Sequence, residues 1–318
     1  MRILFIADPL DSFKLYKDTT YTMMREADAR GHALSFCLQS GMFVRAGAVQ
    51  ANARSITLVK PLVQADVGWY VAQEPHPERL AAFDAVVMRK DPPFDMEYIY
   101  STYLLEHAQS QGARVFNSGR AIRDHSEKLS ILEFPQFTAP TLVARDEAQL
   151  RAFITEHGDT IFKPLDGMGG AGIFRVRADD PNTGSIIEAL TDNGARTIMA
   201  QQYLPAIKDG DKRVLLINGK PAPYCLARIP KAGETRGNLA AGGTGVARAL
   251  TKRDRDIAEA LGPTLAARGL MLVGLDIIGE HLTEINVTSP TCFREIMDQT
   301  GTNVAGLFVD AIEAAAGQ

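Results

Sequence analysis

Residues 160–176 read Thr-Ile-Phe-Lys-Pro-Leu-Asp-Gly-Met-Gly-Gly-Ala-Gly-Ile-Phe-Arg-Val, and this stretch decides the fold. One apolar run ends in a cluster of glycines, and a second apolar run follows. The glycines fit the spacing G-x-G-x-x-G, but the dinucleotide-binding form of that motif needs a helix directly after them. Here the pattern indicates a strand, a glycine loop and a second strand. Such a loop can offer backbone N–H groups to phosphates, as the glycine-rich loop of protein kinases does.

Lys163 is the one charged residue before Asp166 in the first apolar run. Burial of an ammonium group is costly unless an anion meets it, which favours a phosphate as its partner. The alternative is an ordinary hairpin whose lysine buries its stem and keeps its head in water. Because four glycines follow so closely, we expect phosphate binding.

The composition describes a globular protein of more than one packed unit. The chain has 318 residues, of which 46% are hydrophobic and 23% charged. A net charge of −4 gives no general attraction to nucleic acid or to an anionic membrane, and no apolar run approaches membrane-spanning length. Three widely spaced cysteines form no C-x-x-C pair, which fits a reducing cytoplasm. We therefore expect a cytoplasmic protein that binds neither nucleic acid nor membrane.

The first third of the chain alternates short apolar strands with helices, which predicts an α/β domain with a parallel sheet. The expected strands cover residues 2–7, 33–38, 85–88 and 114–116, and a boundary is expected within residues 123–129. Ligands of such sheets bind beyond the carboxyl ends of the strands. Candidate sites there are Asp8, the turn Arg89-Lys90-Asp91 and the pair Asn117-Ser118.

The turn Arg89-Lys90-Asp91-Pro92-Pro93 is the most informative of these candidates. Two prolines fix the backbone, so Arg89 and Lys90 would form a rigid cationic pair for an anionic substrate. A rigid surface turn with solvated charges explains the spacing equally well. Both interpretations stay open at this point.

Residues 228–245 contain five glycines and no helical or strand period. Loops of this length inside compact domains are usually functional or disordered. Arg228 at the root and Arg236 within the loop favour a cationic lid over an anionic ligand, which would exclude water from a reactive intermediate. The alternative is a plain flexible linker, although linkers favour Gly and Ser without paired arginines.

Residues 270–287 predict a hairpin that turns at Gly279-Glu280. With a three-residue loop centred on Glu280, Asp276 lies opposite Glu284, and Asn286 shares their face. Facing carboxylates repel, and a cation between them removes that repulsion. All-oxygen ligands beside phosphates favour Mg²⁺. A carboxylate pair that shares a proton, or another register, remains a competing explanation.

Two further segments belong to the expected site. The strand 197–203 ends at Leu204-Pro205, where backbone groups beside apolar side chains would receive an adenine. The loop 286–292 is rich in hydroxyl groups and precedes a short helix, an arrangement suited to a carboxylate or phosphate. Cys292 has no histidine assigned to it, so we expect a buried thiol and no nucleophile. Together these features describe an ATP-dependent enzyme without a P-loop.

The motifs resemble those of the ATP-grasp superfamily, and more closely those of its bacterial glutathione synthetases. Lys163 with Glu284 and Asn286 would mark only the superfamily. The closer resemblance rests on longer segments across nearly the whole chain: Met88-Arg-Lys-Asp-Pro-Pro-Phe-Asp95, Lys163-Pro-Leu-Asp-Gly-Met-Gly-Gly170, residues 228–243 and Glu284-Ile-Asn-Val-Thr-Ser-Pro290.

This resemblance implies that ATP, γ-glutamylcysteine and glycine give glutathione, ADP and phosphate through an acylphosphate. It implies Mg²⁺, or Mn²⁺, as cofactor and ATP as co-substrate. The implied metal ligands are Asp276, Glu284 and Asn286. The implied nucleotide-binding residues are Lys128, Lys163, Asp166, Gly167, Gly169, Gly170, Gln201, Tyr203, Leu204 and Asp211. The implied substrate-binding residues are Arg89, Asp91, Arg213, Arg228, Arg236 and Ser289. Catalysis is implied for Lys163, Arg213 and Arg228.

The resemblance also implies a fold and an assembly. An N-terminal doubly wound substrate domain, residues 1–124, precedes a two-part ATP-grasp domain, residues 125–318. That second domain carries the glycine-rich flap 166–172 and the lid 228–245. A homo-oligomer, a dimer or a tetramer, is implied as well, with small molecules as the other partners.

Overall fold

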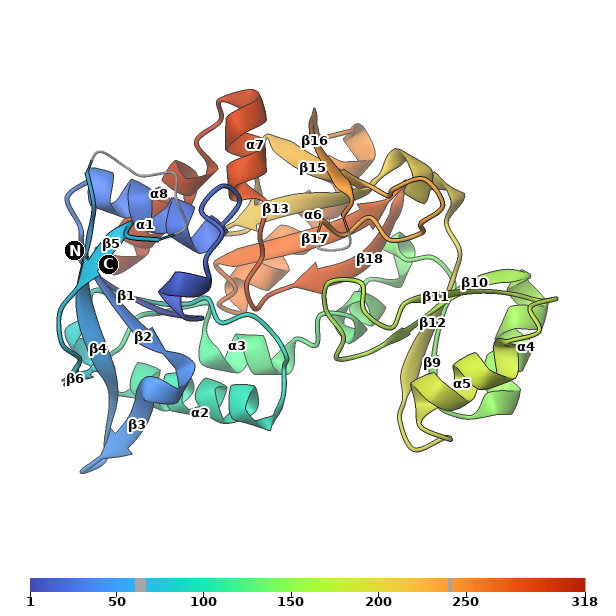
Figure 1. Ribbon diagram of the computed structural model, residues 1–318, viewed down its shortest axis with the longest axis horizontal. Helices are drawn as coiled ribbons and strands as arrows, with labels where there is room; N and C mark the ends of the chain where they lie inside the picture. The colour runs from blue at the N-terminus through green and yellow to red at the C-terminus, as the bar shows by residue number, and fades with distance from the viewer. Residues whose placement is uncertain (61–66, 240–241, 318) are drawn as a thin grey trace.

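The computed structural model describes residues 1–60, 67–239 and 242–317. The strands within these ranges form three sheets, which lie one after another along the longest axis of the molecule (Figure 1). No helix in the described part of the chain has both the length and the apolar character to cross a membrane.

The N-terminal sheet has the predicted parallel core. β1 pairs in parallel with β2 and β7, and β7 pairs in parallel with β8. The chain then adds antiparallel strands at one edge of this sheet. Its strands are β1 Arg2–Ala7, β2 Ala33–Leu38, β3 Met42–Arg45, β4 Ala48–Leu58, β5 Tyr70–Ala72, β6 His76–Arg79, β7 Ala85–Met88 and β8 Val115–Phe116. Its helices are α1 Thr19–Ala29, α2 Met96–Ser110 and α3 Gly119–Asp124.

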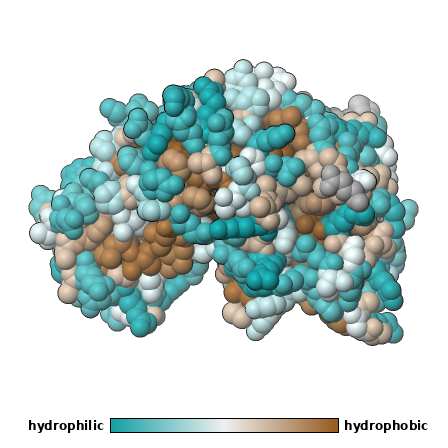
Figure 2. All heavy atoms as spheres, turned by 180° about the vertical axis from the view of Figure 1, so that it is seen from behind, coloured by the Kyte–Doolittle hydropathy of each residue, from teal (hydrophilic) through white to brown (hydrophobic). Residues whose placement is uncertain are grey.

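The second sheet forms the smaller lobe at the right of Figure 1, and helices α4 and α5 cover it. It is antiparallel throughout, in the order β11-β10-β12-β9. Its elements are β9 Thr141–Ala144, α4 Glu147–His157, β10 Asp159–Pro164, β11 Phe174–Arg177, α5 Thr183–Thr191 and β12 Ile198–Gln202. Seen from behind, apolar residues gather on this lobe beside a notch that separates it from the rest of the surface (Figure 2).

The third sheet lies at the centre of the molecule. Its order is β16-β15-β13-β17-β18, with the short β14 beside β13. Its strands are β13 Asp211–Ile217, β14 Lys220–Pro221, β15 Tyr224–Ile229, β16 Thr244–Ala249, β17 Leu272–Ile278 and β18 His281–Asn286. The helices of this part are α6 Lys252–Ala267, α7 Phe293–Thr300 and α8 Val304–Ala316.

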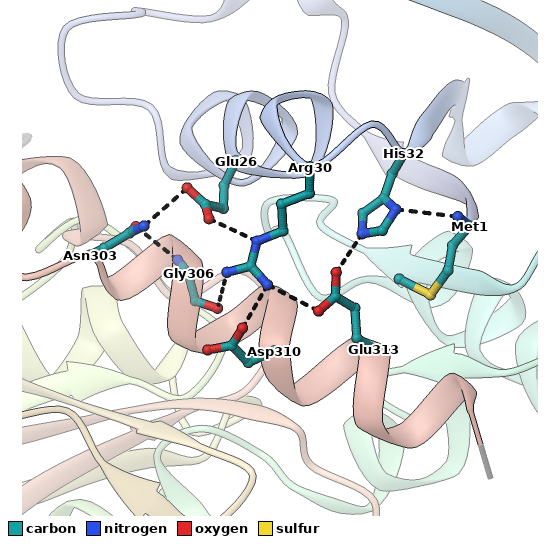
Figure 3. A network of polar contacts seen from close by, with 8 residues as sticks. All are labelled: Met1, Glu26, Arg30, His32, Asn303, Gly306, Asp310 and Glu313. Atoms are coloured by element: carbon teal, nitrogen blue, oxygen red, sulfur yellow. Dashed lines mark hydrogen bonds and ion pairs between the residues drawn. The ribbon is translucent and has the colours of Figure 1, made fainter.

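The C-terminal helix α8 packs on α1 of the N-terminal part, and a polar network joins them (Figure 3). The Arg30 guanidinium lies 2.6 Å from Asp310 and 3.0 Å from Glu313, and it donates to the Gly306 carbonyl. His32 lies between Glu313 and the N-terminal amine of Met1. One apolar core also runs from Ile3 to Phe308. The two ends of the chain therefore share a core, and the division at residue 124 stays a prediction.

Candidate active site

The glycine stretch folds as predicted. β10 and β11 pair antiparallel with Phe162 opposite Phe174, and the glycine loop joins them. Gly169, Gly170 and Gly172 adopt positive φ, a conformation that favours glycine. Lys163 is buried, and its Nζ donates to the Thr283 carbonyl at 3.3 Å. Burial lowers the pKa of Lys163 to about 8, and the negative charge of Glu284 opposes this shift without cancelling it.

The predicted pairing of Asp276 with Glu284 is confirmed, although the predicted turn is wrong. The loop has two residues, Gly279 and Glu280, because Ile278 pairs with His281. A shift in register next to Asp276 adds one residue on the β18 side, at Thr283. The shorter turn and this bulge offset each other, so Asp276 and Glu284 still face each other, and Asn286 lies opposite Gly274.

The repulsion between these acids is relieved in a way the sequence did not predict. Arg213 Nε donates to Asp276 at 2.6 Å, and Arg228 Nη2 lies 2.9 Å from the same carboxylate. Burial alone would raise the pKa of Asp276, but the two guanidinium groups outweigh it and hold that pKa below its usual range. The Arg213 side chain passes over Gly274. It has room there because glycine has no Cβ, since a Cβ at residue 274 would lie 2.7 Å from Arg213 Cδ. Side chains therefore relieve the repulsion at Asp276 without a metal, and the metal site stays a prediction.

Asp211 completes this buried group of charges. Arg228 Nη2 lies 2.5 Å from one carboxylate oxygen of Asp211. The other oxygen is buried and has no hydrogen-bond partner within the described ranges. Burial raises the pKa of Asp211 to about 6, and the neighbouring Arg228 opposes that rise.

Lys128 connects the acidic hairpin to the glycine loop. Its Nζ lies 2.8 Å from the Glu284 carboxylate and donates to the Gly167 carbonyl at 2.6 Å. Although burial opposes it, Glu284 raises the pKa of Lys128. The lysine is therefore charged at neutral pH, and it holds the two predicted parts of the site beside each other.

These residues line one cavity of about 320 Å³ between the second and third sheets. Every residue that the family resemblance implied for the site contributes to its wall except Arg89 and Asp166. The charged residues of the described lining are five cations and five acids: Lys128, Lys163, Arg213, Arg228 and Arg236 against Asp91, Glu127, Asp211, Asp276 and Glu284. The cavity is therefore formally neutral, and a polyanionic ligand would need cations beyond those of the protein.

The apolar end of the cavity lies where β12 leaves the second sheet. Gln201, Tyr203 and Leu204 line it together with Ile161 and Ile278. The Arg175 guanidinium stacks 3.6 Å from the centre of the Tyr203 ring and is itself fixed by Asp159. A flat, apolar ligand group fits this end of the cavity best.

Arg89 and Asp166 lie outside the cavity wall. Asp166 is exposed and pairs with Arg196 at 2.9 Å. Arg89 is buried, donates to Thr20 Oγ1 and to the Pro290 carbonyl, and leaves Nη1 without a partner in the described structure. Burial lowers the pKa of Arg89. Arg89 and Lys90 do not act as a pair, since Lys90 lies 2.9 Å from Asp8.

Asn117 serves the fold and is not free for a ligand. Its side chain accepts from Leu272 N–H and donates to the carbonyls of Leu272 and Val287, each at 2.8 Å. These bonds fix the end of β8 against the third sheet. The candidate pair Asn117-Ser118 is thus a structural contact between sheets.

The predicted lid 228–245 is too long at both ends, because β15 extends to Ile229 and β16 begins at Thr244. The loop between these strands lies against the glycine loop. Arg236 pairs with Glu234 and approaches the Gly170 carbonyl at 3.5 Å, and residues 235–239 line the cavity. Gly237 rests on Arg228, because a Cβ there would lie 2.4 Å from the Arg228 carbonyl oxygen. Residues 240–241 of the predicted lid lie outside the described ranges.

Glu127 is the one charged residue of the described lining that sequence reasoning missed. Its carboxylate accepts hydrogen bonds from Val287 N–H, Thr288 N–H and Thr288 Oγ1 at 2.8 to 3.0 Å. Burial, together with the charge of Glu284, raises the pKa of Glu127. An acid beside a lysine at the start of a short 3-10 helix gives no motif by which the sequence could have revealed it.

Two family models match this chain. The model of the prokaryotic glutathione synthetase N-terminal domain covers residues 1–123, and the model of the prokaryotic glutathione synthetase ATP-grasp domain covers residues 127–301. The chain belongs to this family. As a member of the glutathione synthetase family, the protein is an ATP-grasp carboxylate–amine ligase, and the predicted fold class and enzyme class are confirmed.

Curated glutathione synthetases resemble the chain along its whole length. The enzyme of Ralstonia nicotianae is 63% identical over 318 residues, which is all of this chain and 97% of the relative. The enzyme of Nitrosomonas europaea is 62% identical over 313 residues, which is 98% of each chain.

Solved structures share the fold at lower identity. ATP-grasp ligase PsnB, solved with a minimal precursor, Mg and ADP, has a TM-score of 0.63 at 18% identity and covers 100% of this chain and 98% of its own. D-cycloserine synthetase DcsG has a TM-score of 0.67 at 16% identity, with 99% of each chain covered. At these identities the likeness is one of fold alone.

Proposed function

We propose that the protein joins γ-glutamylcysteine to glycine with ATP, giving glutathione, ADP and phosphate. The observation that carries the proposal is the cavity in which Lys128 links the Glu284 hairpin to the Gly167 loop. The names of the curated relatives support the choice of substrates.

ATP lies with its adenine at the apolar end of the cavity, beside Gln201, Tyr203 and Leu204. Lys128 and Lys163 bind the phosphates, and backbone N–H groups of the glycine loop cover them. Asp211 serves the nucleotide through the carboxylate oxygen that has no partner among the described residues. Asp166 is more distant, at the exposed base of the loop, and acts through the position of that loop.

Divalent cations fit the donors that face the cavity. Asn286 Nδ2 donates to the Gly274 carbonyl, which leaves its amide oxygen for a ligand. Lys128 takes one oxygen of Glu284 and leaves the other. Asp276 is less available, since two arginines bind it, and the described residues hold no cluster of three His, Cys, Asp or Glu side chains with metal-ligand geometry. Hard oxygen donors and a formally neutral cavity favour Mg²⁺, or Mn²⁺. Glu284 and Asn286 would bind this ion directly, and Asp276 would lie behind these two residues. Such an ion neutralises charge on the phosphates.

The chemistry proceeds in two transfers. A carboxylate oxygen of the cysteinyl residue attacks the γ-phosphorus of ATP, and ADP leaves. The glycine amine, having lost a proton, attacks the carbonyl carbon of the resulting acylphosphate, and phosphate leaves. Arg213 and Arg228 stabilise the negative charge that develops on the phosphoryl and acyl oxygens. The lid keeps water from the acylphosphate.

The peptide lies toward the N-terminal part. Asp91 and Ser289 line the cavity there and are hydrogen-bonded to each other. Arg236 approaches from the lid. Arg89 is buried behind the loop that carries Ser289, and it supports the substrate side by holding the Pro290 carbonyl of that loop.

The test is ADP release from ATP on addition of γ-glutamylcysteine with a panel of amino acids. We expect release that depends on glycine, and the Arg228→Ala variant should bind ATP without releasing ADP. Release that depends on another amine would support the ligase activity but show that the amine acceptor is not glycine. No release with any amine would overturn the proposal.

Two further proposals rest on family resemblance and composition. We propose a cytoplasmic location and assembly into a dimer or tetramer. Light scattering of the purified protein tests the assembly, and a monomer at micromolar concentration would contradict it.

A further inference from the structure

The loop that follows the metal hairpin, residues 287–293, is held by the N-terminal part of the chain. Ser289 donates to Asp91, the Pro290 carbonyl accepts from Arg89, and Phe293 N–H donates to Thr19. Val287 and Thr288 donate to Glu127. The loop is therefore the direct connection between the proposed metal ligands and the proposed peptide side of the cavity.

Glu127 and Lys128 form hydrogen bonds or an ion pair with the residues on either side of Asn286. Lys128 pairs with Glu284 at 2.8 Å, and the Glu127 carbonyl accepts from Ile285 N–H at 2.8 Å. The Glu127 carboxylate then accepts from Val287 N–H, Thr288 N–H and Thr288 Oγ1. Glu127 therefore binds the backbone N–H groups on both sides of Asn286, those of Ile285 and Val287.

A half-buried carboxylate is a costly way to secure a loop, because it must give up part of its hydration. Three hydrogen bonds to one oxygen atom repay that cost and leave the backbone at residues 287 and 288 little freedom. A partner of this kind orients metal ligands without binding the metal itself.

We propose that Glu127 is a positioning residue, which sets the Asn286 amide oxygen against the metal and Ser289 against the peptide at the same time. The inference rests on the proposed function of this cavity. It goes beyond that function in assigning the alignment of the two halves of the site to one carboxylate oxygen of a single side chain.

Two conservative variants at residue 127 separate the position of the acceptor oxygen from the charge of the side chain. Glu127→Gln keeps an acceptor oxygen at the same place and loses the charge, whereas Glu127→Asp keeps the charge and draws the oxygen back by one methylene. If position matters, the Gln variant should retain function better than the Asp variant. Thr288→Val is a milder companion, since it removes one of the three hydrogen bonds.

The first measurement is binding of Mn²⁺ to the ADP-loaded protein, followed by electron paramagnetic resonance. We expect Glu127→Asp to weaken binding by about 10- to 100-fold, Glu127→Gln by less than about threefold, and Thr288→Val to fall between them. The second is hydrogen exchange of a peptide spanning residues 284–291, which should accelerate in the Asp variant and not in the Gln variant.

Kinetics complete the test. In the Asp variant we expect kcat to fall and the KM for the metal and for γ-glutamylcysteine to rise, while the KM for glycine changes little. A larger loss in the Gln variant than in the Asp variant would show that charge rather than position matters, and would overturn the inference; equal losses would overturn it as well, because position alone would not explain them. So would unchanged Mn²⁺ binding in the Asp variant. Failure of the proposed function appears separately, as wild-type protein without glycine-dependent ADP release.

Discussion

The ammonium of Lys128 lies 2.8 Å from the carboxylate of Glu284, and the same nitrogen donates to the Gly167 carbonyl of the glycine loop. One side chain thus fixes the distance between the proposed metal hairpin and the proposed phosphate flap. Lys128→Met should lower kcat/KM for ATP by at least about 100-fold, because it removes both a phosphate ligand and this link. Steady-state kinetics give the value. Lys252→Met, which breaks an exposed pair with Asp256, is the control and should change nothing. A Lys128→Met enzyme within tenfold of wild type would contradict this role.

The buried arginines should contribute to stability as well as to turnover. Arg228→Ala leaves Asp211 without its ion-pair partner and Asp276 with Arg213 alone. Removal of one member of a buried ion pair costs about 3 kcal/mol or more in the free energy of unfolding. Urea denaturation should show this loss together with the loss of turnover. Turnover lost at unchanged stability would mean that the arginine is held by something other than these acids.

The pKa of about 8 at Lys163 predicts a pH dependence of nucleotide binding. Below that pKa the ammonium is already present, so ATP affinity should be flat. Above it each binding event must also take up a proton, so affinity should fall by up to about tenfold per pH unit. Titration calorimetry from pH 7 to pH 9.5 checks this. Lys163→Met should bind weakly at all pH values and lose the slope, whereas a slope that persists in the variant belongs to another group.

The lid should be sensitive to a single methyl group at Gly237. A Cβ there would lie 2.4 Å from the Arg228 carbonyl and 3.1 Å from Asp211 Cβ, so Gly237→Ala must lift the lid from its support. We expect near-normal ATP affinity, lower glutathione formation and more ADP than product, because water reaches the acylphosphate. Gly41→Ala is the matched control, since its Cβ meets nothing closer than 3.7 Å. ADP and glutathione formed in equal amounts by Gly237→Ala would rule out this closure.

The network in Figure 3 predicts that the two chain ends stabilise each other. Arg30 is partly exposed, and its pairs reach both α1 and α8, so Arg30→Met should cost about 1 kcal/mol and lower the melting temperature by a few degrees. Arg294→Met breaks one exposed pair within α7 and should cost less. If the two variants melt together, the network does not join the ends.

Local patterns in the sequence predicted much of the fold. The parallel strands, the glycine hairpin and the facing acids Asp276 and Glu284 all followed from apolar runs, glycines and the period of a strand. The turn at Gly279 was predicted one residue too long. The bulge at Thr283 adds one residue on the β18 side, so Asp276 still faces Glu284. A bulge of this kind has no local signature, because it depends on what the neighbouring strand requires.

The parts that the sequence did not predict depend on contacts between distant residues. Arg213 and Asp276 are 63 residues apart, and the same carboxylate also receives Arg228, so their mutual neutralisation appears only once β13, β15 and β17 are aligned. Glu127 was missed for the same reason, since its partners lie 160 residues further on. Arg89 was predicted at the cavity, but it lies one layer behind it, under the Pro290 carbonyl.

The central claim is that a carboxylate of the peptide is phosphorylated in the cavity between Gly167 and Glu284. The most direct measurement uses γ-glutamylcysteine whose cysteinyl carboxylate carries ¹⁸O, with glycine and ATP, and determines the isotope in the released phosphate by mass spectrometry. The account predicts one ¹⁸O atom in each phosphate from the wild-type protein. Phosphate without ¹⁸O, released along with glutathione, would contradict it.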